Sequence, residues 1–164
     1  MPRKLFLFVL FILIPLTVAF AQSEPPQRED IWICPGGEMA FYSVSGPAWG
    51  GGLAFGYGSG TSIGLKANWF ICPDGINTLE LNFLFRIYFL GSSAFSGPFI
   101  QITGGPAFFT NTGGVDVPSE FGMISAGLGL GWRFILGNLF FIEPSIRGGY
   151  PYILGAGLSA GIRF

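Results

Sequence analysis

The last twelve residues of the chain, Ile153 to Phe164, alternate between two kinds of side chain. One set of positions is apolar and comprises Leu154, Ala156, Leu158, Ala160, Ile162 and Phe164. The other set is small or polar and comprises Gly155, Gly157, Ser159, Gly161 and Arg163. Because successive side chains of a strand point to opposite faces, this pattern predicts a β-strand with one apolar face and one small or polar face.

The same alternation recurs along most of the chain and predicts about eight strands. Turn signals rich in glycine, proline and asparagine, such as Gly58-Ser59-Gly60 and Gly137-Asn138, separate the segments. The first segment has the weakest pattern, and its facing stays open. The expected strands are Glu38 to Ser45, Ala48 to Tyr57, Ser62 to Ile71, Thr78 to Leu90, Pro98 to Phe109, Phe121 to Phe134, Leu139 to Tyr150 and Ile153 to Phe164.

The composition favours a membrane environment for these strands. Only 10% of the residues are charged and 50% are hydrophobic, whereas soluble domains carry roughly 25% charged residues. After residue 21, however, no clean apolar run reaches the ~20 residues of a spanning helix. The nearest candidate, Phe121 to Ile142, contains Arg133 and alternate glycines. Since lipid offers no partner to an unpaired backbone group, we expect a closed antiparallel transmembrane β-barrel of all-β class.

The charged residues of the clearer strands show which face points inward. All of them fall on the small or polar face. If that face were outside, the barrel would be a soluble one of lipocalin type, and nearly every large apolar side chain would have to fit inside about eight strands. We therefore expect the apolar face to meet lipid and the charges to share a narrow lumen. These lumenal residues are Lys66, Glu80, Arg86, Arg133, Glu143, Arg147 and Arg163.

Hairpin register predicts how the lumenal charges pair. Diagonal neighbours ~7–8 Å apart are within reach of long side chains, and a buried charge needs a partner. We expect the ion pairs Lys66–Glu80 and Arg133–Glu143, with Arg163 near the second. Arg86 and Arg147 should stack on, or hydrogen-bond to, Gln101, Tyr88 or Ser145. This network predicts a filled lumen; the alternative is a wet pore that the charges line.

The start of the chain is typical of an export signal. Arg3 and Lys4 precede an apolar run from Leu5 to Phe20 that ends in Ala19-Phe20-Ala21. Residues 1–21 are therefore expected to be a cleaved signal peptide, with an uncleaved anchor as the alternative. The polar, proline-containing residues 22–37 are expected to form a flexible periplasmic leader, followed by the barrel at 38–164. Residues 31–34 could be a short strand or an interfacial anchor.

The two cysteines, Cys34 and Cys72, lie in similar contexts, I-C-P-G-G and I-C-P-D-G. An exported compartment permits a disulfide between them. The alternative is two free thiols. If Cys34 precedes the first strand, it lies at the periplasmic end of the barrel, whereas Cys72 ends a strand that runs toward the outer end. The distance between their α-carbons would then exceed the ~7 Å that a disulfide allows.

Composition also narrows the function classes. The chain contains no histidine, which is the commonest general base and metal ligand, so we expect neither an enzyme nor a cofactor. Without Arg3 and Lys4, six basic residues face nine acidic ones. This balance gives no reason to expect nucleic-acid binding.

Trp49 and Trp69 are expected near one membrane interface, and Tyr57, Trp132 and Phe164 near the other.

The alternating strands and the aromatic end resemble the small bacterial outer-membrane barrels of the OmpA/OmpX/OmpW-like class, over Gly37 to Phe164. The resemblance implies an outer-membrane location and a monomer whose partners are membrane lipid and the barrel-assembly machinery. Outward-facing Leu158, Ile162 and Phe164 would form the signal that this machinery reads. The chain departs from the class at two short outer connections, 45–47 and 149–151, which argue against a large receptor or adhesin surface.

Two functions remain open at this point. The first is a structural or surface-exposed outer-membrane protein with a side-chain-filled lumen. The second is a narrow transporter or channel for small or apolar solutes, which would leave through a lateral gap in the wall.

Overall fold

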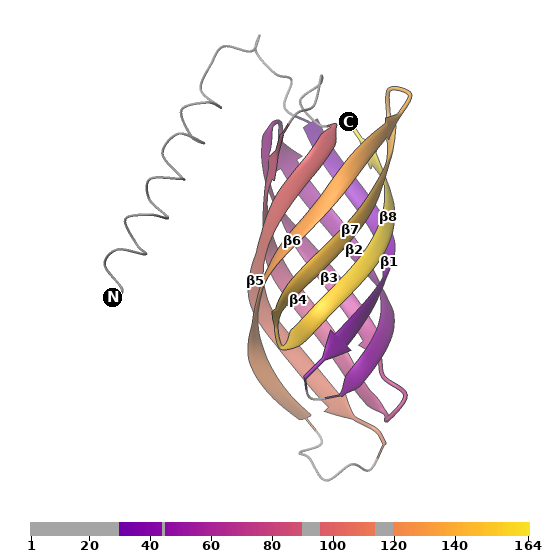
Figure 1. The fold of residues 1–164 in the computed structure, drawn as a ribbon, viewed down its shortest axis with the longest axis vertical. Helices are drawn as coiled ribbons and strands as arrows, with labels where there is room; N and C mark the ends of the chain where they lie inside the picture. Colours follow the sequence, from indigo (N-terminus) through magenta and orange to yellow (C-terminus); the bar gives the residue numbers. More distant parts are fainter. Residues whose placement is uncertain (1–29, 44, 90–95, 114–119) are drawn as a thin grey trace, which may run out of the picture.

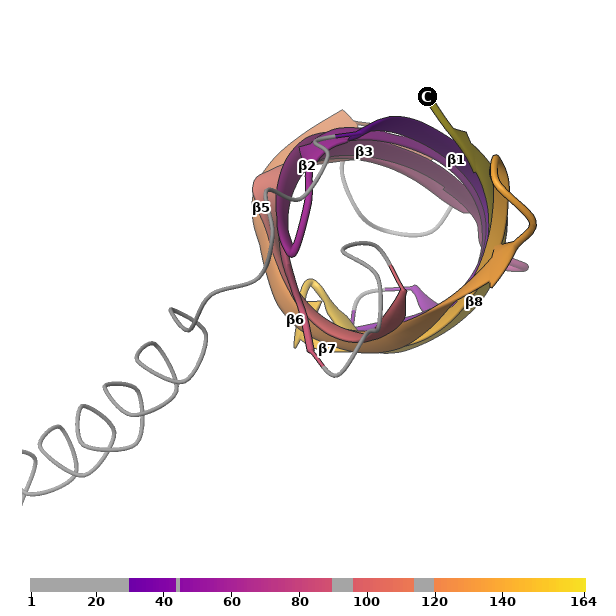
Figure 2. The same ribbon diagram turned by 90° about the horizontal axis from the view of Figure 1, so that it is seen from above.

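The computed structural model describes residues 30–43, 45–89, 96–113 and 120–164. These residues form a closed barrel of eight antiparallel strands, in which each strand pairs with its neighbours in sequence and β8 pairs with β1 (Figures 1 and 2). The predicted fold class is confirmed. The strands are β1 (Asp30–Tyr42), β2 (Gly46–Gly58), β3 (Thr61–Ile71), β4 (Ile76–Tyr88), β5 (Gly97–Asn111), β6 (Glu120–Leu136), β7 (Phe140–Tyr150) and β8 (Tyr152–Arg163).

The first strand corrects the sequence-based boundary between leader and barrel. β1 begins at Asp30, not at Glu38, so residues 30–37 belong to the wall and not to a flexible leader. Pro35 and the two glycines after it concealed the alternation. Trp32, Cys34 and Glu38 nonetheless point inward at even spacing, while Ile31 and Met39 are exposed. The predicted signal peptide lies outside the described residues.

The facing of the other strands agrees with the sequence pattern. Large apolar side chains cover the outside of the wall, among them Leu65, Phe83, Ile102 and Leu128. Trp49 and Trp69 lie toward the end of the barrel where β1 meets β2, and Tyr57 and Trp132 lie toward the opposite end. All four are 43–53% exposed. This arrangement is typical of the aromatic belts of transmembrane barrels.

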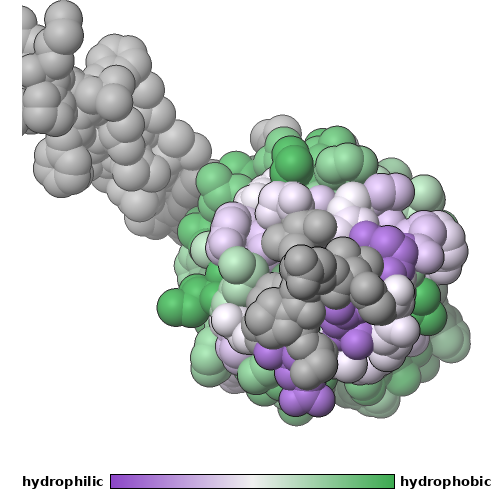
Figure 3. Space-filling model, turned by 90° about the horizontal axis from the view of Figure 1, so that it is seen from below, coloured by the Kyte–Doolittle hydropathy of each residue, from purple (hydrophilic) through white to green (hydrophobic). Residues whose placement is uncertain are grey.

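The connections differ between the two ends of the barrel. We call the end where β1 begins and β8 finishes the terminal end, and the other the distal end (Figure 1). Distal connections are tied to one another: the Ser43 amide donates to the Pro151 carbonyl at 3.0 Å, and the Thr112 amide donates to the Gly75 carbonyl at 2.8 Å. Viewed from the distal side, the coloured residues toward the middle are neutral to hydrophilic, and hydrophobic residues of the wall surround them (Figure 3).

Inward glycines make room for the large side chains that cross the barrel. A methyl group on Gly131 would overlap the ring of Phe99, and one on Gly127 would overlap the hydroxyl of Tyr152. Glycine is therefore required at these positions of β6, because bulky side chains from β5 and β8 occupy the space that a larger residue would need. The described part of the chain contains no helix with the length and hydropathy needed to cross a membrane.

Candidate functional site: the barrel lumen

Two apolar clusters occupy the two ends of the lumen. The terminal cluster is built from β1, β2, β4 and β7 and comprises Trp32, Cys34, Ala54, Leu84 and Phe141. The distal cluster is larger and is rich in aromatic rings; it comprises Ala40, Tyr42, Ala48, Phe70, Cys72, Ile76, Ala107, Phe109 and Tyr152. The charged side chains pack against rings of both clusters: Arg133 lies over Phe141 of the terminal cluster, and Arg147 lies over Tyr152 of the distal one.

Glu143 on β7 organises the charges at the terminal side. Its carboxylate accepts hydrogen bonds from Arg86 Nη1 at 2.9 and 3.0 Å and from Arg133 Nε at 2.5 Å. Both guanidinium groups also lie over aromatic rings, with Arg133 3.9 Å from the centroid of Phe141 and Arg86 4.9 Å from that of Trp32. Cation–π contacts of this kind strengthen when the cation is removed from water. We call Glu143, Arg86 and Arg133 the Glu143 cluster.

Two more carboxylates, Glu38 and Glu80, organise the charges next to the distal cluster. Lys66 Nζ lies 2.9 Å from Glu38, and Arg147 bridges the two carboxylates, contacting Glu38 through Nε and Glu80 through Nη1 at 2.8 Å. Glu80 also accepts a hydrogen bond from the Tyr42 hydroxyl at 2.6 Å. We call Glu38, Glu80, Lys66 and Arg147 the two-glutamate cluster. Its two cations balance its two anions, so each buried charge has an opposite charge in contact.

The predicted pairing was partly correct. Arg133 and Glu143 do form an ion pair, and Arg86 does donate to Gln101 at 3.2 Å and to Tyr88 at 3.5 Å. The Lys66–Glu80 pair was wrong, because Lys66 reaches β1, two strands away, where Glu38 lies. Sequence-based pairing considered hairpin neighbours alone, whereas side chains in a narrow barrel also contact strands further around the wall.

Arg147 and Arg163 also differ from expectation. Arg147 pairs with the two glutamates and lies 3.8 Å over the ring of Tyr152, not beside Gln101, Tyr88 or Ser145. Arg163 does not approach Glu143. It lies at the terminal end, where its Nη1 is 3.5 Å from Asp30 and its Nε donates to the Asn138 carbonyl at 3.0 Å. It therefore ties β8 to β1 and to the β6–β7 turn.

Glu38 and Tyr42 are two of the lumenal residues that sequence reasoning missed. Both lie on β1, whose alternation was judged ambiguous. Starting the strand at Trp32 and counting by twos would have placed Cys34, Glu38 and Tyr42 on one face, which is the face that the structure buries.

The two cysteines are free and buried, and the wall keeps them apart. Cys34 lies in register with Ala54 and Lys66, and Cys72 is six residues beyond Lys66. At ~3.3 Å per residue this separation is about 20 Å along the strand, far beyond the reach of a disulfide. Cys34 Sγ is 3.8 Å from Glu143, whereas Cys72 donates to Ser45 Oγ at 3.1 Å. Burial raises the pKa of the Cys72 thiol, which lies just past β3.

Little space is left between the two charged clusters. A cavity of about 10 Å³ remains, lined by residues that include Cys34, Glu38, Lys66, Arg86 and Glu143. A cavity of this size holds about one water molecule. Within the described ranges, no three histidine, cysteine or acidic side chains are grouped so that they could hold a metal ion. The lumen therefore resembles a packed polar core more than a passage.

The residues proposed as an assembly signal lie on the outer wall. Leu158 and Phe164 are exposed and Ile162 is half-buried. Their recognition by an assembly factor stays a prediction.

This wall and this lumen define the class of protein: a small eight-stranded transmembrane β-barrel, apolar outside and filled with paired charges inside. No family model matches the chain, and no curated protein sequence matches it.

Solved structures share the fold. The N-terminal β-barrel domain of Pseudomonas aeruginosa OprF is similar over 82% of this chain and 97% of its own length, with 20% identity and a TM-score of 0.60. The outer-membrane protein OprG of P. aeruginosa matches over 84% and 96%, with 10% identity and a TM-score of 0.52. Ail, the attachment invasion locus protein of Yersinia pestis, matches over 84% and 99%, with 14% identity and a TM-score of 0.50. The OmpA/OmpX-like resemblance is thus confirmed at the level of the fold.

Proposed function

We propose that this chain is an integral protein of the bacterial outer membrane with a structural or surface-exposed role, and that it does not conduct solutes through its lumen. The export signal that the sequence predicts and the fold shared with outer-membrane barrels support the location. A non-enzymatic role fits the chemistry of the site, because Glu38, Glu80 and Glu143 on the described strands are each engaged by a cation or a hydroxyl.

The side chains that fill the lumen are the observation that carries this proposal. A solute would have to displace residues of both apolar clusters and of both charged clusters. The buried guanidinium groups of Arg86 and Arg147 would lose their carboxylates on the way, and breaking a buried ion pair is strongly unfavourable.

Planar-bilayer recording of the refolded full-length protein tests the proposal, with a wide porin in the same lipid as the conducting control. We expect no steady conductance from the wild-type barrel at moderate voltage. A steady, large conductance that scales with the amount of inserted protein would contradict the filled lumen and favour the transporter.

A further inference from the structure

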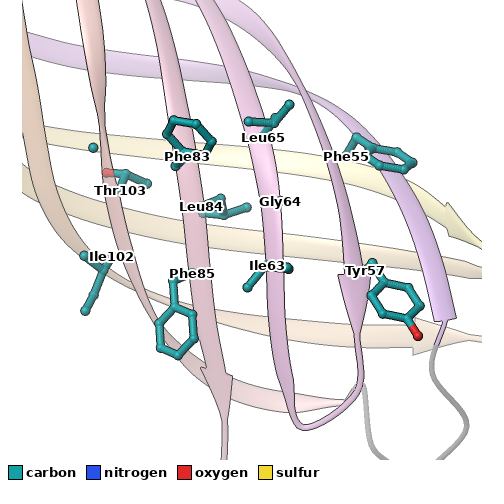
Figure 4. Close-up of a pocket in the computed structure, with 11 residues that line it drawn as sticks. Phe55, Tyr57, Ile63, Gly64, Leu65, Phe83, Leu84, Phe85, Ile102 and Thr103 are labelled. Atoms are coloured by element: carbon teal, nitrogen blue, oxygen red, sulfur yellow. The ribbon is translucent and has the colours of Figure 1, made fainter.

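An apolar groove crosses the outer wall of the barrel from β2 to β5 (Figure 4). Its volume is about 660 Å³, within the 300–1,000 Å³ typical of sites for small molecules. Large side chains from four neighbouring strands form its walls, and the lumenal charges take no part in it.

Strand register arranges these side chains in two parallel rows. Phe55, Leu65 and Phe83 are paired across β2, β3 and β4 and form the first row. Tyr57, Ile63 and Phe85 are paired in the same way two residues further along and form the second row. Rows two residues apart are separated by about 6.6 Å along the strand. The two rows and the strand backbone between them line an apolar groove that runs across the strands.

Gly104 on β5 opens one end of the groove. It pairs with Phe83 and so extends the first row with a position that carries no side chain. The neighbouring second-row position holds Ile102, which is 50% exposed. From β2 to β5 the groove crosses three strand spacings of ~4.8 Å, a length of about 14 Å.

Tyr57 gives the groove one polar end. It is next to the last residue of β2, immediately before the Gly58–Gly60 turn at the terminal end. A tyrosine at this depth lies where hydrocarbon meets headgroups, and its hydroxyl can hydrogen-bond to a lipid ester or phosphate. The groove is therefore apolar inside the hydrocarbon layer and polar where it reaches the interface.

We propose that this groove binds one acyl chain of a glycerophospholipid whose headgroup lies beside Tyr57. The proposal rests on the proposed membrane location and adds a specific lipid site to it. The groove is continuous with the lipid-facing wall, so a lipid enters it without crossing any polar surface. A second copy of the barrel is the competing occupant, and the mass measurement below distinguishes a dimer from a bound lipid.

Gly104→Phe is the variant that tests the site. A β-carbon at Gly104 would meet the Ser125 carbonyl at 3.7 Å, an ordinary contact, so the added ring can extend outward and fill the groove. Gly37→Phe is the matched control: Gly37 also faces outward, its β-carbon would come no closer than 3.9 Å to the Gly50 carbonyl, and it lies outside the groove.

Native mass spectrometry of the detergent-solubilised, full-length protein titrated with a dioleoyl phosphatidylethanolamine measures the binding. We expect one tightly retained phospholipid on the wild type and on Gly37→Phe, and retention about tenfold weaker on Gly104→Phe, a loss equivalent to about 1.4 kcal/mol. Equal retention by all three proteins would overturn the site, as would a wild-type protein that retains no phospholipid or forms a dimer in its place. Resistance of all three to extraction from membranes by alkaline carbonate is measured separately, so that failure of the membrane location is distinguished from failure of the groove.

Discussion

Replacing Glu143 with glutamine should be among the most damaging single changes inside the barrel. Glutamine keeps the shape of the side chain but removes the negative charge. Arg86 and Arg133, which are 4% and 0% exposed, would then lose the carboxylate that they share. Taking one partner from a buried ion pair costs about 3–5 kcal/mol, because the opposite charge stays out of water.

The structure also predicts how the stability cost of Glu143→Gln compares with that of the same substitution at a second glutamate, Glu38. Glu38→Gln should cost less, about 1–3 kcal/mol. Arg147 would keep Glu80 at 2.8 Å, and the Lys66 side chain is 14% exposed. Glu120→Gln is a suitable control, since Glu120 is exposed at the start of β6 and a surface change of this kind is usually within about 0.5 kcal/mol.

Equilibrium unfolding in guanidinium chloride, with the protein refolded into phospholipid vesicles and followed by tryptophan fluorescence, measures all three free energies. A double-mutant cycle with Arg86→Gln isolates the Glu143–Arg86 coupling, which for contacting residues reaches about 0.5–3 kcal/mol. A cost for Glu143→Gln no larger than that for Glu120→Gln would refute the view that these ion pairs hold the lumen together.

Three further predictions concern location, thiols and packing. The mature protein should stay with membranes after alkaline carbonate or urea washing and migrate anomalously on gels unless boiled; release into a soluble fraction would contradict the membrane barrel. Non-reducing mass analysis should find two free thiols, both alkylated quickly only after unfolding, since each is 3% exposed; a mass two hydrogens lighter would show the disulfide after all. Gly105→Ala should destabilise the barrel by about 1–3 kcal/mol, because the added methyl group would overlap the Leu81 carbonyl. Gly104→Ala, at the next position, should be nearly neutral. Similar unfolding midpoints for the two variants would contradict the close approach of β5 to β4 at Gly105.

The sequence predicted the wall of this barrel better than its contents. Alternation in a strand has a fixed period, so Leu65, Phe83 and Leu128 could be assigned to the lipid-facing side from the pattern alone. β1 was harder, because Pro35 and the glycines that follow it look like a linker when the partner strands are not in view. In the barrel those residues lie in register with β2 along their whole length.

The lumen could be predicted only where the partners are hairpin neighbours. Arg133 and Glu143 lie on consecutive strands, and their pairing followed from the turn between them. Arg147 contacts β1 and β4, which are far from β7 in sequence. Such contacts depend on the diameter of the closed barrel and on how far each side chain leans across it, and no local pattern encodes either quantity.

The partners of Arg147 also constrain the order in which the barrel can assemble. Glu38 lies on the first strand, Glu80 on the fourth and Arg147 on the seventh, so their contacts exist only once the sheet has closed. An open sheet already in lipid would present these charges to hydrocarbon without their counter-charges, at a cost of several kcal/mol for each ion. The last seam, between β8 and β1, should therefore close before or during transfer into the bilayer, so that half-inserted sheets do not accumulate as intermediates.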